Sequence, residues 1–343
     1  MYYAFDPSSK NLGGAEMQTY ILAKELSRRN YNVSAILKEN RKPPGSIRIF
    51  VINKRKILST FSLFRAMCRA DADIYYQRTG GFITGIIGLF CTLRNRKFVF
   101  HVSSMHQCRK DWPRGGNFLK RVSYRWGLKG VAKILVQTEN QRSALKKNFG
   151  FESSVIRNMV AELPTKSRKE NMVLWVGTVN ERKRPDVFLR LASSFPKHRF
   201  VMIGGKGENQ EFYRKIERQS QSIKNLEFLG FRPYEETQGY FQKCKVFVNT
   251  SMDEGFPNTY LQAWSNYVPV VALEFDPDEI ICKNSLGFHS RNFDNIVRDV
   301  RLLMEDERMR RRMALNGRLY VEKNHKIEKI ISDYADVFRK LVS

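Results

Sequence analysis

A carboxylate and a carboxamide, Glu254 and Gln262, flank a Gly-Phe-Pro turn in the C-terminal half of the chain. Glu254 lies on the turn, where its oxygens can accept hydrogen bonds from neighbouring hydroxyl groups of a ligand. Asn258 and Thr259 follow the turn and are residue types that commonly cap helices, so a helix is expected to begin near Asn258. The free N–H groups of that helix N-terminus favour an anion. A turn with a cap does not account for a carboxylate and an amide that can face one cleft.

Three consecutive cations, Arg182, Lys183 and Arg184, form a second candidate site. They follow an apolar run typical of a strand and the pair Gly177-Thr178, and the proline behind them suits the first turn of a helix. Cations at a strand end beside a helix N-terminus suit a diphosphate. The alternative is a solvated basic loop without a ligand.

A pair of glycines, Gly13 and Gly14, opens a helical pattern near the start of the chain. Backbone N–H groups at glycines can approach phosphate oxygens because no Cβ stands in the way. A plain turn explains the same pair equally well.

The elements that must position these residues are short apolar runs alternating with amphipathic helical patterns. This alternation is typical of βαβ units and parallel sheets, hence of an α/β fold. Eleven strands are too many for one open sheet, so two doubly wound domains are expected. The predicted strands are Tyr2–Phe5, Val33–Leu37, Ile47–Ile52, Ile74–Gln77, Phe98–Val102, Ala132–Val136, Val173–Val176, Phe200–Ile203, Leu226–Leu229, Val246–Asn249 and Val268–Ala272. The clearest predicted helices are Glu16–Arg29, Asn140–Phe149, Pro185–Phe195 and Phe212–Gln219.

The two domains are expected to join at the segment 160–171, which is polar and charged and has no apolar period. The expected boundaries are 1–162 for an N-terminal domain and 171–324 for a C-terminal domain. A final helix over 325–343 is expected to pack back toward the N-terminal domain.

The positive charge of the chain is concentrated in its N-terminal half. The formal net charge is +26, and residues 1–170 hold 32 Lys and Arg against 11 Asp and Glu, or +21, which leaves +5 for the remainder. Solubility alone needs far less charge. A localised basic field therefore indicates an anionic partner: a membrane surface, a phosphorylated ligand or nucleic acid.

The cysteines and the hydropathy exclude several classes of protein. The five cysteines are scattered without a C-x-x-C pair, and no His, Cys and Asp cluster is apparent, so neither disulfides nor a metal site is expected. No apolar stretch reaches the about 18 residues of a membrane span, and the stretch 80–93 is expected to be a buried helix. The first residues lack the basic segment of a secretory signal, so a cytoplasmic location is expected.

Aromatic residues alternate with cations between Arg109 and Lys129. The stretch fits an amphipathic helix at a membrane surface, and an ordinary helix with a solvated basic face fits it as well. The aromatics are Trp112, Phe118, Tyr124 and Trp126. The residues expected to contact an acceptor or a membrane are Arg109, Lys110, Trp112, Lys120, Arg121 and Arg125.

In order and spacing, these segments resemble glycosyltransferase family 4, a family of retaining enzymes with the GT-B fold. Met202–Gly207 looks like the glycine turn of the family's C-terminal domain, and Leu226–Phe231 is similar to its base-binding stretch. Val136–Gln141 resembles the strand end before the linker. The resemblance implies two Rossmann-like domains facing a cleft. It also implies transfer of a hexose from a UDP- or GDP-linked sugar with retention of configuration and without a metal or other cofactor.

The resemblance implies a role for each candidate residue. Lys183, with Arg182 beside it, would neutralise the diphosphate as the sugar–phosphate bond breaks. The family's E-x7-E pattern falls on Glu254, which would hold sugar hydroxyls, and on Gln262, which replaces the glutamate that binds the ribose. The residues expected to bind the donor are Gly13, Gly14, Gly177, Thr178, Phe231, Gly255, Phe256, Pro257, Asn258, Thr259 and Gln262.

The chain departs from the family pattern at two places. The family often has an arginine where this chain has Thr178, and Arg182 is the expected substitute. Many members have a histidine at the end of an N-domain strand, for which His101, Ser103 and His106 are the candidate positions. His106 is taken as the catalytic candidate.

The expected partners are a nucleotide-sugar donor and a glycan or lipid-linked acceptor of polysaccharide or lipopolysaccharide synthesis. A third is the anionic inner face of the cell membrane, to which the protein would attach peripherally. Two alternatives stay open. One is a GT-B relative that binds without catalysis, prompted by Gln262, and the other is a nucleic-acid-binding protein, for which no known motif is present.

Overall fold

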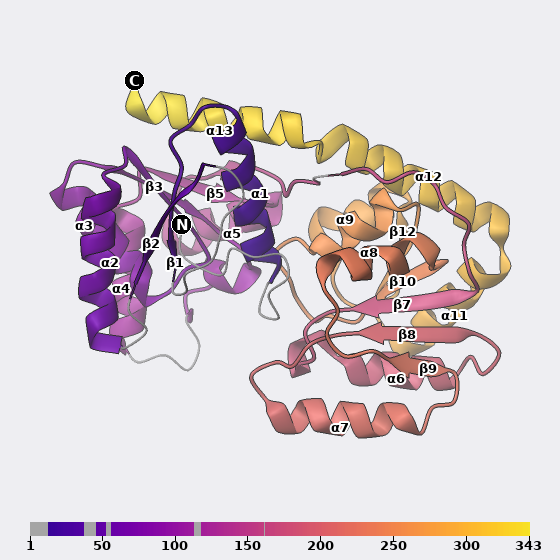
Figure 1. The fold of residues 1–343 in the computed structure, drawn as a ribbon. Helices are drawn as coiled ribbons and strands as arrows, with labels where there is room; N and C mark the ends of the chain where they lie inside the picture. The colour runs from indigo at the N-terminus through magenta and orange to yellow at the C-terminus, as the bar shows by residue number, and fades with distance from the viewer. Residues whose placement is uncertain (1–12, 38–45, 53–55, 113–117, 161) are drawn as a thin grey trace. The chain divides into compact units, whose positions relative to one another are not determined.

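A computed structural model describes residues 13–37, 46–52, 56–112, 118–160 and 162–343 (Figure 1). The predicted strand Tyr2–Phe5 lies outside the described residues. The chain divides into two compact units: the first is Met1–Met159 together with Ile327–Ser343, and the second is Val160–Lys326.

The first unit is built of parallel strands and helices. Its described strands form a four-stranded sheet in the order β3-β4-β5-β6 and a two-stranded sheet of β1 and β2, and all of these pairs are parallel. The strands are β1 (Ser34–Leu37), β2 (Arg48–Val51), β3 (Ile74–Arg78), β4 (Lys97–His101), β5 (Lys133–Val136) and β6 (Ser154–Val155). The helices are α1 (Gly14–Arg28), α2 (Lys56–Ala70), α3 (Phe82–Leu93), η1 (Met105–Cys108), α4 (Phe118–Lys129), α5 (Glu139–Phe149) and α13 (Ile327–Val342).

Side chains of the central strands alternate between two cores, as the pleat of a strand requires. Phe98 and Phe100 of β4 pack with residues of α2, α3, α4 and α5, whereas Val99 packs on the opposite face with α1 and α13. Tyr334 and its neighbours in α13 belong to this second core, where α13 runs beside α1 (Figure 1). The last helix of the chain is therefore an integral part of the first unit.

The second unit is a doubly wound α/β unit with one six-stranded parallel sheet. Its strands are β7 (Met172–Val176), β8 (Arg199–Ile203), β9 (Leu226–Phe228), β10 (Val246–Asn249), β11 (Val270–Ala272) and β12 (Gly287–His289). Its helices are η2 (Glu181–Lys183), α6 (Pro185–Ser193), α7 (Gln210–Gln221), α8 (Tyr234–Lys243), α9 (Asn258–Ser265), η3 (Pro277–Glu279), α10 (Ile280–Asn284), α11 (Phe293–Glu305) and α12 (Glu307–Asn324).

The strand order β12-β11-β10-β7-β8-β9 reverses direction once, between β7 and β10. From β7 the chain proceeds outward to β9, returns to β10 beside β7, and then proceeds outward to β12 on the other side. In such sheets a ligand crevice forms at the carboxyl ends of the two strands at the reversal. The topology therefore predicts a ligand crevice at the loops that follow β7 and β10.

The described residues of the segment 160–171, predicted as a linker, belong to the second unit. The Ser167 hydroxyl donates to the carbonyl of Gln242 at 2.6 Å, and the Lys169 ammonium donates to the carbonyls of Gln242 and Asn266, each at 2.7 Å. The division between the units falls at Met159, before the polar stretch begins. The polar composition of this segment thus serves hydrogen bonding to backbone carbonyls.

Candidate functional site

The predicted donor residues of the second unit lie on the two loops at the reversal of strand order. Gly177 to Arg184 follow β7, and Thr250 to Pro257 follow β10. The two strands are hydrogen-bonded neighbours in the sheet. Residues about 70 positions apart in the sequence are consequently brought together at one edge.

Lys183 and Glu254 form an ion pair and hydrogen bond at this edge. Their side chains are only 19% and 12% exposed. Burial raises the pKa of the Glu254 carboxyl, but the charge and hydrogen bond of Lys183 outweigh it, so the pKa lies below its ordinary value. The carboxylate is therefore ionised at neutral pH and can accept hydrogen bonds from hydroxyl groups.

The neighbouring cations are paired in the same manner. Arg182 lies 3.6 Å from a carboxylate oxygen of Asp253, and Arg184 pairs with Glu274 in the loop after β11. Arg184 also adopts a left-handed conformation, φ 47°, which turns the chain into α6. Each of the three cations thus faces its own carboxylate. The alternative of a basic loop without a ligand stays open.

A buried chain of hydrogen bonds holds the two loops together beneath the ion pair. The indole N–H of Trp175 donates to the Thr250 hydroxyl at 2.9 Å, and that hydroxyl donates to the carbonyl of Lys183 at 2.6 Å. The N–H of Met252 donates to the carbonyl of Arg182 at 3.0 Å. The backbone that carries the cations is thereby attached to the backbone that carries Glu254. Neither Trp175 nor Thr250 was among the predicted site residues.

Glycines allow the loop after β8 to approach the loop after β7. The N–H of Gly177 donates to the carbonyl of Ile203 at 3.0 Å, and a Cβ on Gly207 would lie 2.7 Å from the carbonyl oxygen of Val179. Phe231 lies beside this turn, because a Cβ on Gly205 would lie 3.4 Å from its ring. Thr178 is exposed on the same loop.

The helix after the Gly-Phe-Pro turn begins where it was predicted, but with a different cap. α9 starts at Asn258, its N-cap is Pro257, and no side chain makes a cap hydrogen bond. The expectation that Asn258 or Thr259 would cap the helix is therefore wrong, since both lie inside its first turn. Gly255, Phe256 and Pro257 are buried, whereas Asn258, Thr259 and Gln262 are half-buried and reachable by a ligand.

The glycine pair of the first unit lies at the start of a helix. Gly13 is the N-cap of α1 and Gly14 its first residue, and both are exposed. The first turn carries Glu16, whose pKa is raised by burial against the opposing effects of backbone hydrogen bonds and the charge of Arg78. The predicted contact of Gly13 and Gly14 with a diphosphate stays a prediction.

The histidine candidates at the end of β4 differ in their surroundings. His101 is fully buried, and its Nδ1 lies 2.8 Å from the Tyr334 hydroxyl and 3.1 Å from the Tyr76 hydroxyl. Burial, reinforced by the charge of Arg78, lowers its pKa well below the ordinary value. His101 thus serves the contact with α13. His106 lies on η1 and is partly exposed. Its ring stacks on that of Trp112, with 6.0 Å between the two ring centres. Its catalytic role stays a prediction.

The residues predicted to contact an acceptor or membrane are exposed or half-buried, whereas the neighbouring aromatic Tyr124 is buried. Arg109, Lys110, Lys120 and Arg125 are exposed, and Arg121 and Trp112 are half-buried. Tyr124 is fully buried and donates its hydroxyl to the carbonyl of Gln107 at 3.0 Å. Tyr124 therefore belongs to the core and not to a surface stripe.

Large apolar side chains are exposed on α4 and on its neighbour α3. The residues are Phe118 (79%), Leu119 (68%), Val122 (44%) and Trp126 (47%) on α4, and Phe82 (46%), Leu89 (43%) and Leu93 (66%) on α3. The two helices pack closely, because a Cβ on Gly127 would lie 2.5 Å from the backbone of Thr84. The expectation that 80–93 forms a buried helix is correct for one face of α3 only. None of the described helices is both long and apolar enough to cross a membrane.

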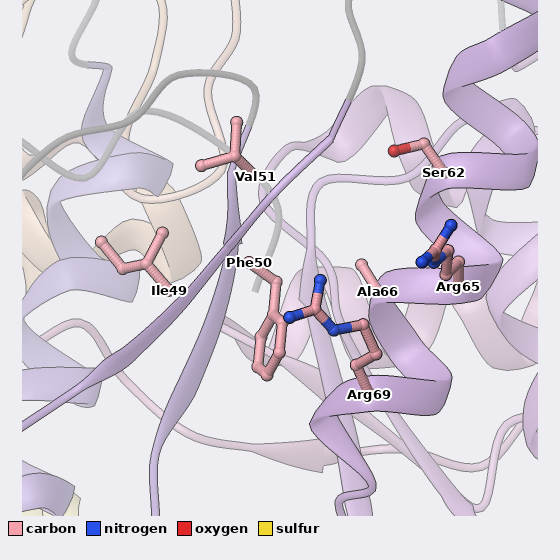
Figure 2. Close-up of a pocket in the computed structure, with 7 residues that line it drawn as sticks. All are labelled: Ile49, Phe50, Val51, Ser62, Arg65, Ala66 and Arg69. Carbon is pink, nitrogen blue, oxygen red and sulfur yellow. The ribbon is translucent and has the colours of Figure 1, made fainter.

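A pocket of about 280 Å³ lies between β2 and α2 of the first unit (Figure 2). It contains two cations, Arg65 and Arg69, and the Arg69 guanidinium lies 5.6 Å from the centre of the Phe50 ring. None of the predicted site residues lines it.

Known proteins resemble this chain in sequence and in fold. Residues 161–320 match the family model of glycosyl transferases group 1. The chain is 26% identical over 351 residues, covering 93% of each chain, to a Campylobacter jejuni enzyme named GalNAc-alpha-(1->4)-GalNAc-alpha-(1->3)-diNAcBac-PP-undecaprenol alpha-1,4-N-acetyl-D-galactosaminyltransferase. Sucrose-phosphate synthase from Thermosynechococcus elongatus has a similar structure, with a TM-score of 0.80, 15% identity, and coverage of 99% of this chain and 98% of that chain. The Anabaena protein HepE in complex with UDP-glucose gives a TM-score of 0.79 at 14% identity, with the same coverage.

Two parallel α/β units, a charged pair at the strand reversal and these likenesses lead to one conclusion. Residues 161–320 resemble the group 1 glycosyltransferases, and the chain has the GT-B fold.

Proposed function

We propose that this enzyme transfers a hexose from a UDP- or GDP-linked sugar to a glycan or lipid-linked acceptor, with retention of the anomeric configuration and without a metal. The observation that carries the proposal is the buried pair of Lys183 and Glu254 at the carboxyl ends of β7 and β10. A donor places a diphosphate and a hydroxylated ring side by side, and this pair offers a cation and a carboxylate side by side.

The chemistry requires positive charge where the leaving diphosphate develops negative charge. Lys183 and Arg182 supply it, and the first N–H groups of α9 add partial positive charge. Glu254, kept ionised by Lys183, would accept hydrogen bonds from sugar hydroxyls. Because the two loops are joined through Trp175 and Thr250, the charged groups stand in place before the donor arrives.

Two features bear on the donor and the acceptor. Phe231 offers a half-buried aromatic surface beside the glycine turn, which suits stacking with a nucleotide base. HepE, a structural neighbour, was solved with UDP-glucose, and the Campylobacter jejuni relative is named for an undecaprenol-linked substrate. A UDP-linked donor and a lipid-linked acceptor are the first combination to assay.

The proposal is tested by nucleoside diphosphate release from a panel of UDP- and GDP-linked hexoses, with and without a lipid-linked glycan, in the presence of EDTA. We expect one donor to be turned over and the acceptor to increase its rate. NMR of the product would report the anomeric configuration. Tight donor binding without release would support the alternative of a catalytically inactive relative, and inversion would refute the proposed stereochemistry.

Gln262 is expected to act in binding and not in the chemical step. If Gln262 contacts the ribose, Gln262→Ala removes an interaction that is equal in the ground and transition states, so KM should rise about tenfold with kcat nearly unchanged. Gln262→Glu, which places the usual residue of the family at this position, should keep the KM of the wild type. Steady-state kinetics with varied donor check both variants, and a loss confined to kcat would assign Gln262 another role.

We further propose that the exposed apolar residues of α3 and α4 dock on an anionic membrane. Phe118, Leu119 and Trp126 are exposed on a helix that also carries the exposed cations Lys120 and Arg125. Apolar side chains can enter the boundary between headgroups and acyl chains while cations contact anionic lipids. Nucleic acid would use the cations but would leave the apolar side chains in water.

Charge reversal on α4 tests the membrane proposal. The double variant Lys120→Glu, Arg125→Glu should lower binding to anionic vesicles by at least about 30-fold, because each basic residue near such a surface is worth about 1 kcal/mol and each glutamate adds repulsion. A matched control, Lys146→Glu with Lys147→Glu on the exposed side of α5, should bind nearly as the wild type does. Sedimentation with anionic and neutral vesicles at low and high salt gives the measurement, with duplex DNA as competitor. Equal binding of both variants, or displacement by DNA, would contradict membrane docking by α4.

A further inference from the structure

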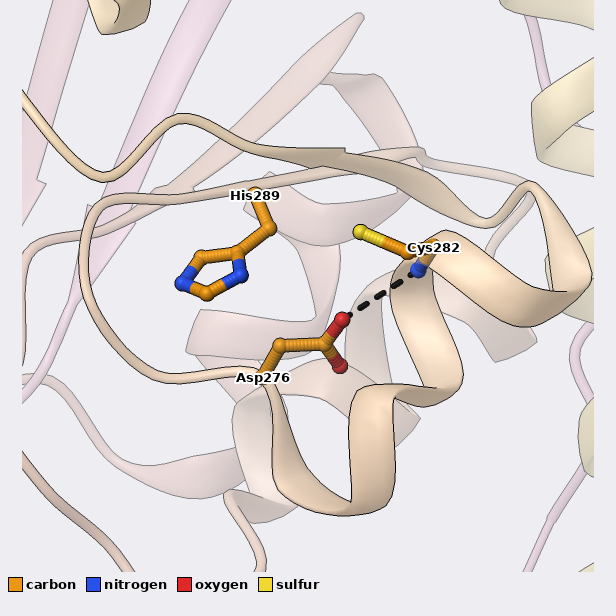
Figure 3. Close-up of side chains that lie close together, drawn as sticks. All are labelled: Asp276, Cys282 and His289. Carbon is orange, nitrogen blue, oxygen red and sulfur yellow. Dashed lines mark hydrogen bonds between the residues drawn. The ribbon is translucent and has the colours of Figure 1, made fainter.

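Three residues with metal-ligating side chains gather at one edge of the second unit, apart from the pair of Lys183 and Glu254. They are Asp276, Cys282 and His289, and one ligand atom from each lies within 4.8 Å of the other two. Figure 3 shows the carboxylate, the thiol and the imidazole directed into the space that the three residues enclose. The expectation from the sequence that no such cluster exists is therefore wrong.

Regular elements position all three residues. His289 is the last residue of β12, the edge strand, and is paired in register with Ala272 of β11. Asp276 lies four residues beyond the end of β11. Its two carboxylate oxygens accept hydrogen bonds from the N–H groups of Ile281 (2.9 Å) and Cys282 (3.2 Å). Cys282 lies in α10, so these bonds fix α10 against the loop that carries the carboxylate.

We propose that Asp276, Cys282 and His289 bind one Zn²⁺ ion, with water in the fourth position. A thiolate, an imidazole and a carboxylate are the ligand types that zinc uses, with bond lengths of about 2.0–2.3 Å. Tetrahedral angles then place ligand atoms about 3.3–3.6 Å apart. The ligand atoms are now separated by up to 4.8 Å. Side-chain movements of about 1 Å would shorten these separations to the range that zinc requires. The sulfur and nitrogen ligands favour zinc over magnesium or calcium, which prefer oxygen.

The existing bonds of the three residues leave them able to ligate. A carboxylate offers about four lone-pair positions, so Asp276 can keep both backbone hydrogen bonds and still coordinate a cation. Nε2 of His289 is buried and has no hydrogen-bond partner among the described residues, so no second protein group selects the tautomer of the ring. Cys282 is exposed, which gives an ion a path from solvent.

The ion would join three points of the connection between β11 and β12. That connection contains non-glycine residues in the left-handed conformation, namely Asp278 (φ 51°), Glu279 (φ 58°) and Ser285 (φ 52°). Such residues persist only where their surroundings hold them. A cross-link between the loop, α10 and the edge strand would do so, and this structural role does not depend on the proposed glycosyl transfer.

Metal binding to the chelator-stripped, tag-free protein tests the proposal. Co²⁺ serves as the probe, because one thiolate ligand gives a charge-transfer band and tetrahedral geometry gives intense visible bands. We expect one Co²⁺ per chain with both signals, displacement by one equivalent of Zn²⁺, and a raised melting temperature with Zn²⁺. Cys282→Ala and His289→Ala should each lower the affinity by more than about 100-fold, beyond what loss of an outer contact costs. Cys68→Ala, which removes a half-buried cysteine of the first unit, is the matched control and should bind as the wild type does.

A measurement on the unaltered protein guards against variants that fail to fold. Zn²⁺ should protect Cys282 from alkylation at least tenfold and leave the rate at Cys68 unchanged, as peptide mass spectrometry would report. Absence of the charge-transfer band, or its persistence in Cys282→Ala, would overturn the site. Equal protection of both cysteines would overturn it as well, since that result means unspecific binding.

Discussion

Lys183→Ala should reduce kcat at saturating donor by at least about a hundredfold while the second unit stays folded. The variant removes the buried cation next to the position proposed for the diphosphate. A single electrostatic group aimed at developing charge is commonly worth about 3–4 kcal/mol in the transition state. Initial rates of nucleoside diphosphate release measure the loss.

The same variant should change the pH dependence of donor binding. In the wild type the pKa of Glu254 lies below 4.5, because Lys183 outweighs the effect of burial. The ion pair therefore contributes stability above about pH 4.5, which is lost as the pH falls through the lowered pKa. Without Lys183, the main group that lowers the pKa of Glu254 is lost, so burial raises this pKa. As the solution is acidified, donor affinity should therefore begin to fall at a higher pH in the variant than in the wild type.

Lys215→Ala provides a matched control, since Lys215 is exposed on α7 of the same unit. Its rate and pH profile should equal those of the wild type. If Lys183→Ala turned over donor as fast as Lys215→Ala does, Lys183 would not be part of the catalytic site.

Gly287→Ala should destabilise the second unit by about 3 kcal/mol or more. Gly287 has φ 148° where β12 pairs with β11, and a Cβ there would overlap the carbonyl oxygen of Val270. The obstacle is backbone at the first residue pair of β11 and β12, and it cannot rotate away as a side chain could. Overpacking costs about 1–3 kcal/mol even where side chains can shift, and backbone strain adds to it. Urea unfolding followed by circular dichroism gives the change in free energy.

Gly239→Ala is the corresponding control and should have the opposite sign. Gly239 lies inside α8, and nothing stands within 4 Å of its would-be Cβ. Alanine in a helix is favoured over glycine by roughly 0.5–1 kcal/mol, so this variant should be slightly more stable. Similar losses in both variants would mean that Gly287 is not constrained by Val270.

Local sequence patterns predicted the elements well, because they depend on neighbours in the chain. All predicted strands within the described residues are present, with ends that differ by at most two residues. The strands that were missed, β6 and β12, have two and three residues and form edges of their sheets, where a short run carries little pattern. Tyr124 was misjudged because an aromatic among cations reads as a surface residue, whereas its ring completes the core beneath α4.

The partners of the candidate residues could not be predicted, because they come from distant parts of the chain. Lys183 and Glu254 were predicted singly, yet their pairing depends on the β7–β10 contact across 71 positions. Trp175 appeared only as the end of an apolar run, and its bond to Thr250 joins residues 75 positions apart. Asp276, Cys282 and His289 follow no metal-binding spacing, and only the fold of α10 brings them together.

The return of the last helix to the first unit makes the second unit an insertion in the topological sense. The chain leaves the first unit after Met159 and re-enters it at Ile327, and the two passages are tied by a parallel bridge between Val160 and Lys326. The second unit is therefore a continuous segment with its ends side by side, which could be expressed without the first unit. The first unit is discontinuous, and cutting the chain before Ile327 would strip Tyr334 from His101 and expose the apolar face of α1. The first unit can thus close only after α13 has been synthesised.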